Sequence, residues 1–124
     1  MPELIEKLKK YDTYIFVSPN YFRMPPGIFK DFIDRTSILY ETGDLKKKRA
    51  AIIVVGAEEP KGTDICTNII VNNFCKIQGM KVIAQKSFKS NSELKGNYND
   101  IFENKYNKNI LKDLEEIVEK LVKK

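Results

Sequence analysis

The sequence predicts a small α/β domain, with a parallel sheet of about three strands and flanking helices. Helix-like and strand-like segments alternate in the order helix, strand, helix, strand, helix, strand, long loop, helix. Such alternation gives parallel strands joined by right-handed crossovers. Residues 50–55 (AAIIVV) are apolar on both faces, as in a strand that helices cover on both sides of a sheet. A chain of 124 residues is expected to form a single domain, residues 1–124.

The first half of the chain predicts two helices around one strand. Residues 1–10 carry apolar side chains on one helical face and lysines on the other. Residues 13–17 (TYIFV) form a β-branched and aromatic run that is typical of a buried strand. A second helix is expected from about Pro26 to about Tyr40, and Gly43 suits the left-handed residue that ends a helix.

The central segment predicts a helix between two strands, the first at residues 50–55 and the second at residues 81–85. Either Thr63 or Asp64 is expected to cap this helix, because both side chains can accept a hydrogen bond from the first helical turn. Gly79 is expected to end it.

The last third of the chain predicts a long loop followed by one helix. Residues 87–107 are polar, but they include aromatic residues at four-residue spacing that indicate a short helical piece inside the loop. We expect these rings, Tyr98, Phe102 and Tyr106, to cover an edge of the core. Residues 110–122 carry an apolar stripe wide enough to pack against a sheet.

The composition is that of a globular protein, with 42% hydrophobic and 31% charged residues. No apolar run approaches the roughly 20 residues that a membrane-spanning helix needs. The N-terminus lacks the basic and then apolar pattern of a signal peptide. We therefore expect a cytoplasmic protein that does not bind membranes.

The residues that usually carry acid–base or metal chemistry are scarce. The chain has no histidine, which excludes Ser-His-Asp and Cys-His catalysis. Two cysteines without histidine make a poor zinc site, so no metal site is expected. Cys66 and Cys75 lie nine positions apart in one predicted helix, so they should project from opposite sides as free thiols, with Cys66 more buried than Cys75. No residue is predicted to be catalytic, and any redox chemistry is expected from a cofactor.

The net charge of +5 includes one dense basic cluster, residues 46–49 (KKKR). The cluster is either a solvated connection between a helix and a strand or a patch that binds a polyanion. No aromatic residue is interleaved with it, and no nucleic-acid-binding motif accompanies it. The sequence favours the solvated connection, so nucleic acid is not expected as a partner.

Residues 13–36 predict a turn that binds a ligand. The strand at 13–17 is stopped by residues 18–20 (SPN), and two aromatic residues, Tyr21 and Phe22, follow on the loop. Residues 25–27 (PPG) then fix the start of a helix. Open α/β sheets bind ligands beyond the carboxyl ends of their strands, which is where this loop should lie.

The run SPNYFRMPPGIFKDFIDRT, residues 18–36, resembles the flavodoxin-like NAD(P)H-dependent FMN reductases and the iron–sulfur flavoproteins related to them. Members typically read Ser-Pro-x-Tyr-Phe-Gly, then a proline, then a helix ending Leu-Lys-x-Phe-Ile-Asp-Arg. The matching positions are Ser18, Pro19, Tyr21, Phe22, Pro25 or Pro26, Lys30, Phe32, Ile33, Asp34 and Arg35. The segments AAIIVVGAEE and GMKVIAQKSF are similar to later strands of the family, so the resemblance extends over most of the chain.

The resemblance implies a three-layer, flavodoxin-like sandwich that binds FMN and exchanges hydride with NAD(P)H. It places the isoalloxazine ring of FMN on residues 18–22 and on the loop after the second strand. The residues implied as cofactor contacts are Pro19, Asn20, Tyr21, Phe22, Gly56, Ala57 and Glu58. In such proteins hydride passes between nicotinamide and flavin without a protein acid or base.

The chain also departs from the family's pattern. The fold of the family begins with a β-α-β unit whose loop wraps the FMN phosphate, and the sequence of this chain shows no counterpart of that unit. We therefore expect a truncated, partial flavodoxin-like domain. Arg23 stands where the family has a glycine. Glu58 and Glu59 replace a glycine-rich segment and would repel a phosphate dianion. These differences leave FMN binding as an open expectation.

Two functions are therefore compatible with the sequence. The first is an FMN-binding, NAD(P)H-dependent oxidoreductase or a remnant of one, in which a separate chain supplies the missing N-terminal half. The second is a non-catalytic interaction or structural module that forms a homodimer or higher oligomer. The strand at 13–17 would lack its family neighbour and would present an apolar sheet edge for such association.

Overall fold

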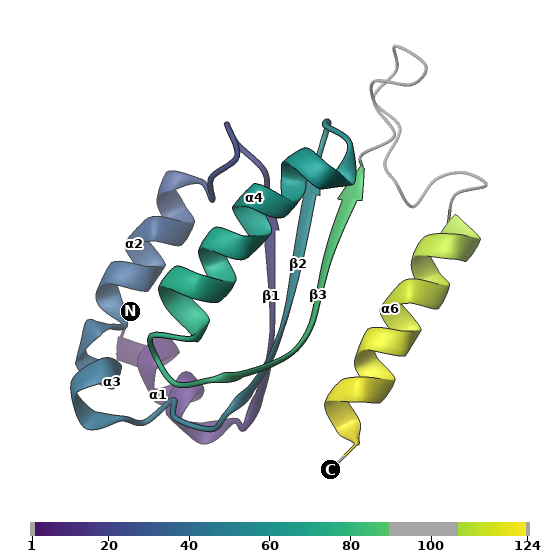
Figure 1. The fold of residues 1–124 in the computed structure, drawn as a ribbon. Helices are drawn as coiled ribbons and strands as arrows, with labels where there is room; N and C mark the ends of the chain where they lie inside the picture. The colour runs from purple at the N-terminus through teal and green to yellow at the C-terminus, as the bar shows by residue number, and fades with distance from the viewer. Residues whose placement is uncertain (1, 90–106, 124) are drawn as a thin grey trace.

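The computed structural model describes residues 2–89 and 107–123 and has the predicted order of elements (Figure 1). Residues 90–106, most of the predicted long loop with its three aromatic residues, lie outside the described part. The helices and strands are α1 (Pro2–Lys10), β1 (Thr13–Pro19), α2 (Gly27–Arg35), α3 (Ser37–Thr42), β2 (Arg49–Gly56), α4 (Pro60–Ile70), the π-helical turn η1 (Val71–Cys75), β3 (Lys81–Lys89) and α6 (Asn107–Val122). No helix among these described residues is long and apolar enough to cross a membrane.

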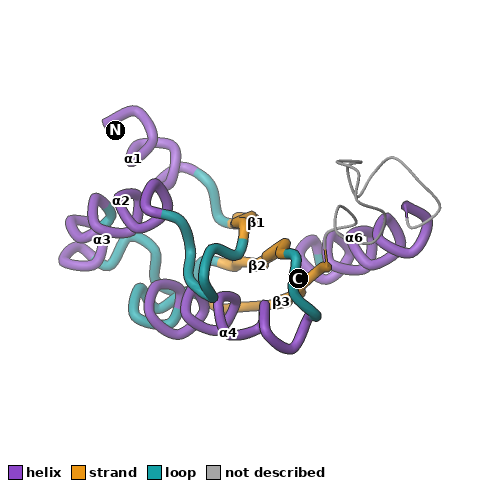
Figure 2. Tube along the Cα trace, turned by 90° about the horizontal axis from the view of Figure 1, so that it is seen from above, coloured by secondary structure: helices purple, strands orange, loops and turns teal. Residues whose placement is uncertain are grey.

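The three strands form one parallel sheet in the order β1-β2-β3, as predicted. Figure 2 shows α2, α3 and α4 on one side of this sheet and α6 on the other, which gives three layers. The central strand β2 is covered on both faces, and its residues 50–54 are buried. This explains the continuous apolar run in its sequence.

The larger core lies between the sheet and the helices α2 and α4, and its centre is aromatic. Phe16 of β1 lies within 5.4–6.4 Å, between ring centroids, of Phe29 and Phe32 of α2 and Phe74 of η1. Edge-to-face and tilted contacts of this kind are favourable beyond simple burial. The cluster fixes α2 against β1, and so fixes the loop that joins them.

The predicted second helix is divided in two at Thr36. The Thr36 hydroxyl donates to the carbonyl of Ile33 at 2.6 Å, and the side-chain amide of Gln78 donates to the Thr36 carbonyl at 3.1 Å. Both contacts are made in addition to the backbone hydrogen bonds at Thr36, whose carbonyl still accepts from Leu39 and Tyr40 at 2.9 and 3.3 Å. The helix ends at Arg35 and α3 follows it, so the prediction of one continuous helix to Tyr40 was wrong.

The helix after β2 begins earlier than predicted. Pro60 is its first residue, where the fixed φ of proline and the missing N–H are both tolerated. Neither Thr63 nor Asp64 is its cap: Thr63 is buried inside the helix. The next strand also extends beyond its predicted end at residue 85, to Lys89.

Both cysteines are free, and both are fully buried. The expectation that Cys75 would be less buried than Cys66 was wrong. The reason is the π-helical turn η1, in which the amide of Lys76 donates to the carbonyl of Val71 at 2.9 Å. The wider turn advances each residue by less than the 100° of an α-helix, so Cys75 is brought round toward the core.

The edge strand β1 is covered on one face only. Tyr14 and Phe16 pack against the larger core, whereas Ile15 is 46% and Val17 61% exposed. The helix α6 packs on β2 and β3 and leaves this face of β1 open. The expectation of a buried strand was therefore half right: its aromatic residues are inside and its β-branched residues are outside.

Two residues of the basic cluster have structural partners. The ammonium group of Lys48 donates to the carbonyls of Leu8, Lys9 and Tyr11 at 2.7–2.8 Å, and so caps the C-terminal end of α1. Arg49 donates to the backbone carbonyl of Lys120 in α6 at 2.6 Å. A cation at a helix C-terminus is favoured by the helix dipole. The cluster was expected to be a solvated connection, but Lys48 and Arg49 hold α1 and α6 in place, while Lys46 and Lys47 are exposed.

Candidate functional site

The candidate site lies beyond the carboxyl ends of β1 and β2. These ends lie side by side because the strands are parallel, with Pro19 in register with Val55. The amide of Asn20 donates to the carbonyl of Val55 at 2.8 Å and continues the pairing past the strand. The loop after β1 is thereby held next to the loop after β2, as the sequence predicted.

The loop after β1 is a tight two-residue turn closed by Tyr21 and Met24. Each of these two residues donates its amide to the other's carbonyl at 3.0 Å. The residues between them have left-handed backbones, with φ of 53° at Phe22 and 63° at Arg23. Turns of this type favour asparagine and glycine, and a bulky side chain is strained there. The turn holds the Phe22 ring out into solvent, where it is 95% exposed.

A polar network joins this turn to the loop after β2. The guanidinium of Arg23 donates through Nε and Nη2 to Oε1 of Glu58 at 3.1 and 3.0 Å. The side-chain amide of Asn20 donates to Oε2 of Glu58 at 2.8 Å and to the Thr63 hydroxyl at 3.3 Å. The hydrogen bonds from Arg23 and Asn20, together with the positive charge of Arg23, lower the pKa of the Glu58 carboxyl below its ordinary value. Glu58 is therefore an anion at neutral pH.

Two glycines allow the loops to approach this closely. A Cβ atom on Gly56 would lie 2.8 Å from the Cβ atom of Asn20 and 3.0 Å from the Thr63 hydroxyl. A Cβ atom on Gly62 would lie 2.8 Å from the carboxyl carbon of Glu58. A larger residue at Gly56 would therefore push the loop of Asn20 away, and a larger residue at Gly62 would displace the carboxylate of Glu58 from its present position.

Between the two loops lies an open cavity of about 450 Å³. Its lining residues are Asn20, Phe22, Arg23, Ala57 and Glu58. One polar atom of a lining residue lacks a partner among the described residues: Oδ1 of Asn20, which is itself buried. A buried acceptor without a donor is costly, and a ligand N–H could reach it only after the Asn20 side chain turned toward the cavity.

Most of the residues predicted as cofactor contacts meet here. Asn20, Phe22, Ala57 and Glu58 line the cavity, and Gly56 supports it from behind Asn20. Pro19 and Tyr21 are exposed nearby but do not line it. For all seven predicted residues the role as a cofactor contact stays a prediction.

Three residues of the site lie outside the set of cofactor contacts that the sequence predicts. Arg23, which departs from the family's glycine, lines the cavity and holds Glu58. Thr63, one of the two predicted helix caps, and Gly62 lie in the first turn of α4, and Glu58 lies two residues before that helix begins. Only the correct helix start at Pro60 places Gly62 and Thr63 next to Glu58.

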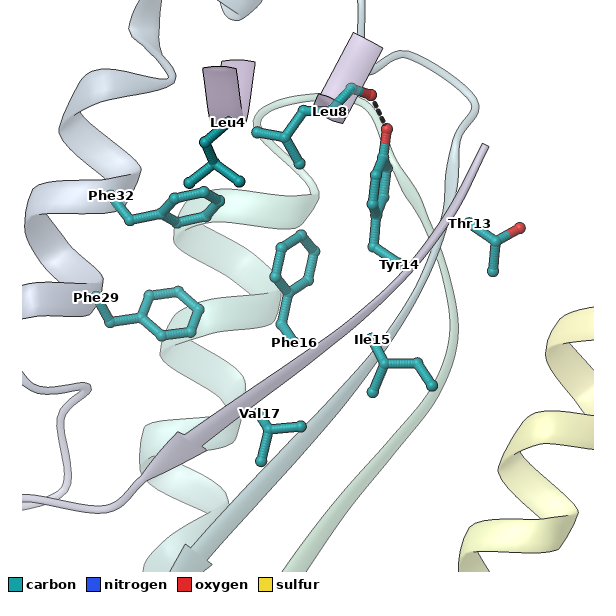
Figure 3. A pocket seen from close by; sticks show the side chains of 9 residues that line it. All are labelled: Leu4, Leu8, Thr13, Tyr14, Ile15, Phe16, Val17, Phe29 and Phe32. Atoms are coloured by element: carbon teal, nitrogen blue, oxygen red, sulfur yellow. Dashed lines mark hydrogen bonds between the residues drawn. The ribbon is translucent and has the colours of Figure 1, made fainter. Parts of the chain in front are cut away.

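A second feature is an apolar groove of about 510 Å³ along the free edge of β1 (Figure 3). It is lined by Leu4, Leu8, Thr13, Tyr14, Ile15, Phe16, Val17, Phe29 and Phe32. The Tyr14 hydroxyl closes one end by donating to the carbonyl of Leu8, and burial raises the pKa of this phenol to about 12. Within the described residues, no cluster of histidine, cysteine, aspartate and glutamate could hold a metal ion.

Comparisons with known proteins agree on one family and one fold. The family model described as NADPH-dependent FMN reductase matches residues 1–95. No curated protein sequence matches the chain.

Solved structures with the same fold include three bacterial proteins. One is a flavodoxin, WrbA-like protein from Agrobacterium tumefaciens, at 18% identity and a TM-score of 0.60 over 70% of this chain and 59% of that one. Another is an NADPH-quinone reductase from P. pentosaceus, at 14% identity and a TM-score of 0.59 over 71% of this chain and 60% of that one. The third is general stress protein 14 from Treponema denticola in complex with FMN, at 13% identity and a TM-score of 0.60 over 75% of this chain and 62% of that one.

These similarities establish the α/β flavodoxin-like fold that the sequence predicted, with its three-stranded parallel sheet and flanking helices. At these identities they establish the fold alone. The chain spans about three fifths of the length of each of these proteins, 59–62%.

Proposed function

The chain belongs to the NADPH-dependent FMN reductase family, and on that basis we propose that the cavity beyond β1 and β2 binds the isoalloxazine ring of a flavin. The observation that carries the proposal is the cavity itself, which combines an exposed aromatic ring with an unsatisfied buried acceptor. Phe22 offers a flat apolar surface that ligand binding would cover. A flavin presents a planar ring with an imide N–H, which would supply the donor that Oδ1 of Asn20 lacks if the Asn20 side chain turned toward the ring.

The residues present fit the ring of the cofactor. Phe22 and Ala57 would provide apolar contact, and Asn20 would orient the ring through its amide. A bound flavin would supply the hydride chemistry, with NAD(P)H as the donor. Glu58 is held as an anion and would act by fixing Asn20 and Arg23 rather than by transferring a proton.

Flavin binding is tested by following flavin fluorescence while purified protein is added. We expect saturable quenching, and we expect Phe22→Ala to weaken binding by about tenfold, since aromatic stacking contributes about 1–3 kcal/mol. Ile28→Ala is the matched control, because Ile28 is 80% exposed on α2 but does not line the cavity. Absence of quenching at about 100 μM protein, or equal affinities of the Phe22 variant and the wild type, would contradict the proposal.

A separate observation favours a second role, self-association through the free edge of β1. The α6 face of this strand exposes Ile15 and Val17. One flank of α6 is polar and faces β3. Its residue Asp113 forms an ion pair with Lys86 of β3, with 3.7 Å between Oδ2 and Nζ. The opposite flank therefore points toward β1, and this flank exposes Leu111, Val118 and Val122.

We infer that the occupant of this edge is a second copy of the chain. Two β1 strands related by a two-fold axis perpendicular to the sheet would pair antiparallel, with Ile15 of one copy beside Val17 of the other. Both α6 helices would then lie on the same face, with their apolar flanks turned toward each other. A specific interface buries at least about 600 Å² per partner, so the exposed side chains of α6 would have to add to the contact made by the strand edge.

The oligomeric state in solution tests this role. Light scattering after gel filtration should give a dimer, and Val17→Lys should give a monomer because the lysine would lie inside the interface. Ile28→Lys adds the same charge at an exposed position away from the edge and should leave the dimer intact. A monomeric wild type at about 100 μM, or association only with a different chain, would rule out the second copy as the occupant.

A further inference from the structure

We propose that this site recognises the flavin ring but not the phosphate, so that unphosphorylated flavins such as riboflavin bind at least as tightly as FMN. The inference rests on the proposed flavin site and specifies its ligand class. It is drawn from the two helices that begin beside the cavity and from the charges around them.

A protein holds a phosphate with backbone N–H groups, usually at the start of a helix. The helix α2 has Pro26, which has no N–H group, as its N-cap, and the amides of Phe29 and Lys30 donate to the Pro26 carbonyl at 3.0 and 3.1 Å, so its start offers only the amides of Gly27 and Ile28. The helix α4 begins at Pro60, and the amides of Gly62 and Thr63 already donate to the carbonyl of Glu59 at 3.0 and 3.3 Å. The prolines thus reduce the number of donors that either of these two helix starts could offer to a phosphate.

The charges at the start of α4 also oppose a phosphate. Glu58 and Glu59 occupy the position where the helix dipole would otherwise attract an anion. The guanidinium of Arg23 is already engaged with Glu58, and the ammonium group of Lys89 contacts Glu59 at 2.7 Å. Lys61 is the cation of the first turn, but it is exposed, and solvated ion pairs contribute little affinity.

The contacts available to the ring are different in kind. They consist of the Phe22 side chain, the small Ala57 and the unpaired acceptor of Asn20, none of which depends on a negative charge in the ligand. The two negative charges that FMN adds to riboflavin would meet the carboxylates of Glu58 and Glu59 without new donors. Ring recognition should therefore dominate the affinity.

The test compares riboflavin and FMN in the same fluorescence titration of the full chain, with inorganic phosphate as a competitor. We expect riboflavin to bind with an affinity equal to or higher than that of FMN, and inorganic phosphate to displace neither. Added salt should change the affinities for FMN and riboflavin to the same small extent, because Arg23 and Lys89 are already paired with Glu58 and Glu59.

The variant Glu59→Gln tests the effect of charge on FMN binding separately from the ring contacts, because Glu59 does not line the cavity. It should strengthen FMN binding severalfold and leave riboflavin binding unaltered. FMN binding about tenfold tighter than riboflavin, or displacement of FMN by phosphate, would overturn this inference and leave the ring site standing. If neither flavin bound, both this inference and the proposed function would fail.

Discussion

Arg23 donates two hydrogen bonds to one carboxylate oxygen of Glu58, and this contact ties the turn after β1 to the loop after β2. The family resemblance places a glycine where Arg23 stands, and the structure supplies the reason. The backbone at Arg23 is left-handed, with φ of 63°, a conformation that glycine adopts without strain. Arg23 therefore has a strained backbone, and in this conformation its side chain reaches Glu58.

We predict that Arg23→Gly is more stable than Arg23→Ala by about 0.5–1 kcal/mol. Both variants lose the contact with Glu58, but only glycine also relieves the left-handed strain. The difference should appear as a shift of about 2–4 °C between their melting temperatures, measured by circular dichroism. Equal melting temperatures would mean that the backbone at residue 23 is not strained.

The lowered pKa of Glu58 predicts a pH dependence of stability. The folded protein holds this carboxyl below its ordinary pKa of 4.5, so the stabilisation is present at pH values above 4.5. It should be lost as the pH falls through the lowered folded value. Urea unfolding of the wild type and of Glu58→Gln should therefore differ at pH 6 and converge in acid. Parallel pH profiles for the two proteins would show that Glu58 gains no special stabilisation of its anion.

Sequence patterns determined the parts of this fold that depend on local residues. The apolar run at 50–55 identified a central strand, and the Ser-Pro-Asn-Tyr-Phe run identified the loop at the cavity. Both inferences depended on neighbouring residues and on the rule that parallel strands end at one edge. Most of the residues expected as cofactor contacts consequently lie together.

The features that were missed depend on contacts between distant residues. Gln78 contacts Thr36, where the second predicted helix is divided, from 42 positions away. The exposure of Ile15 and Val17 depends on where α6 lies, which no pattern within β1 could indicate. The burial of Cys75 depends on one π-helical turn that the apolar periodicity does not signal.

Lys48 is predicted to stabilise α1 in a way that its neighbour Lys47 does not. Its ammonium group donates to three carbonyls at the end of that helix. We expect Lys48→Met to lower the free energy of unfolding by about 1–2 kcal/mol and to speed hydrogen exchange in α1. Lys47→Met removes the same charge from an exposed side chain and should leave both quantities unchanged. Equal effects of the two substitutions would indicate that the net charge, and not the contact of Lys48 with α1, determines the free energy of unfolding.

The two cysteines are predicted to be unreactive in the folded protein. Burial raises the pKa of Cys66 to about 11 and that of Cys75 to about 12, from an ordinary value of 9.0. A thiol reacts as the thiolate, so both should resist a disulfide reagent at pH 8 and react fully in denaturant.

Because the folded pKa values of the two cysteines are raised, the stability of the protein should also fall as the pH rises above 9.0, since the thiols of the unfolded chain ionise first. Replacing Cys75 with alanine separates the two thiols. The variant should have one slow thiol, and rapid labelling of folded Cys66 would contradict the burial of this α4 residue between its helix and the sheet.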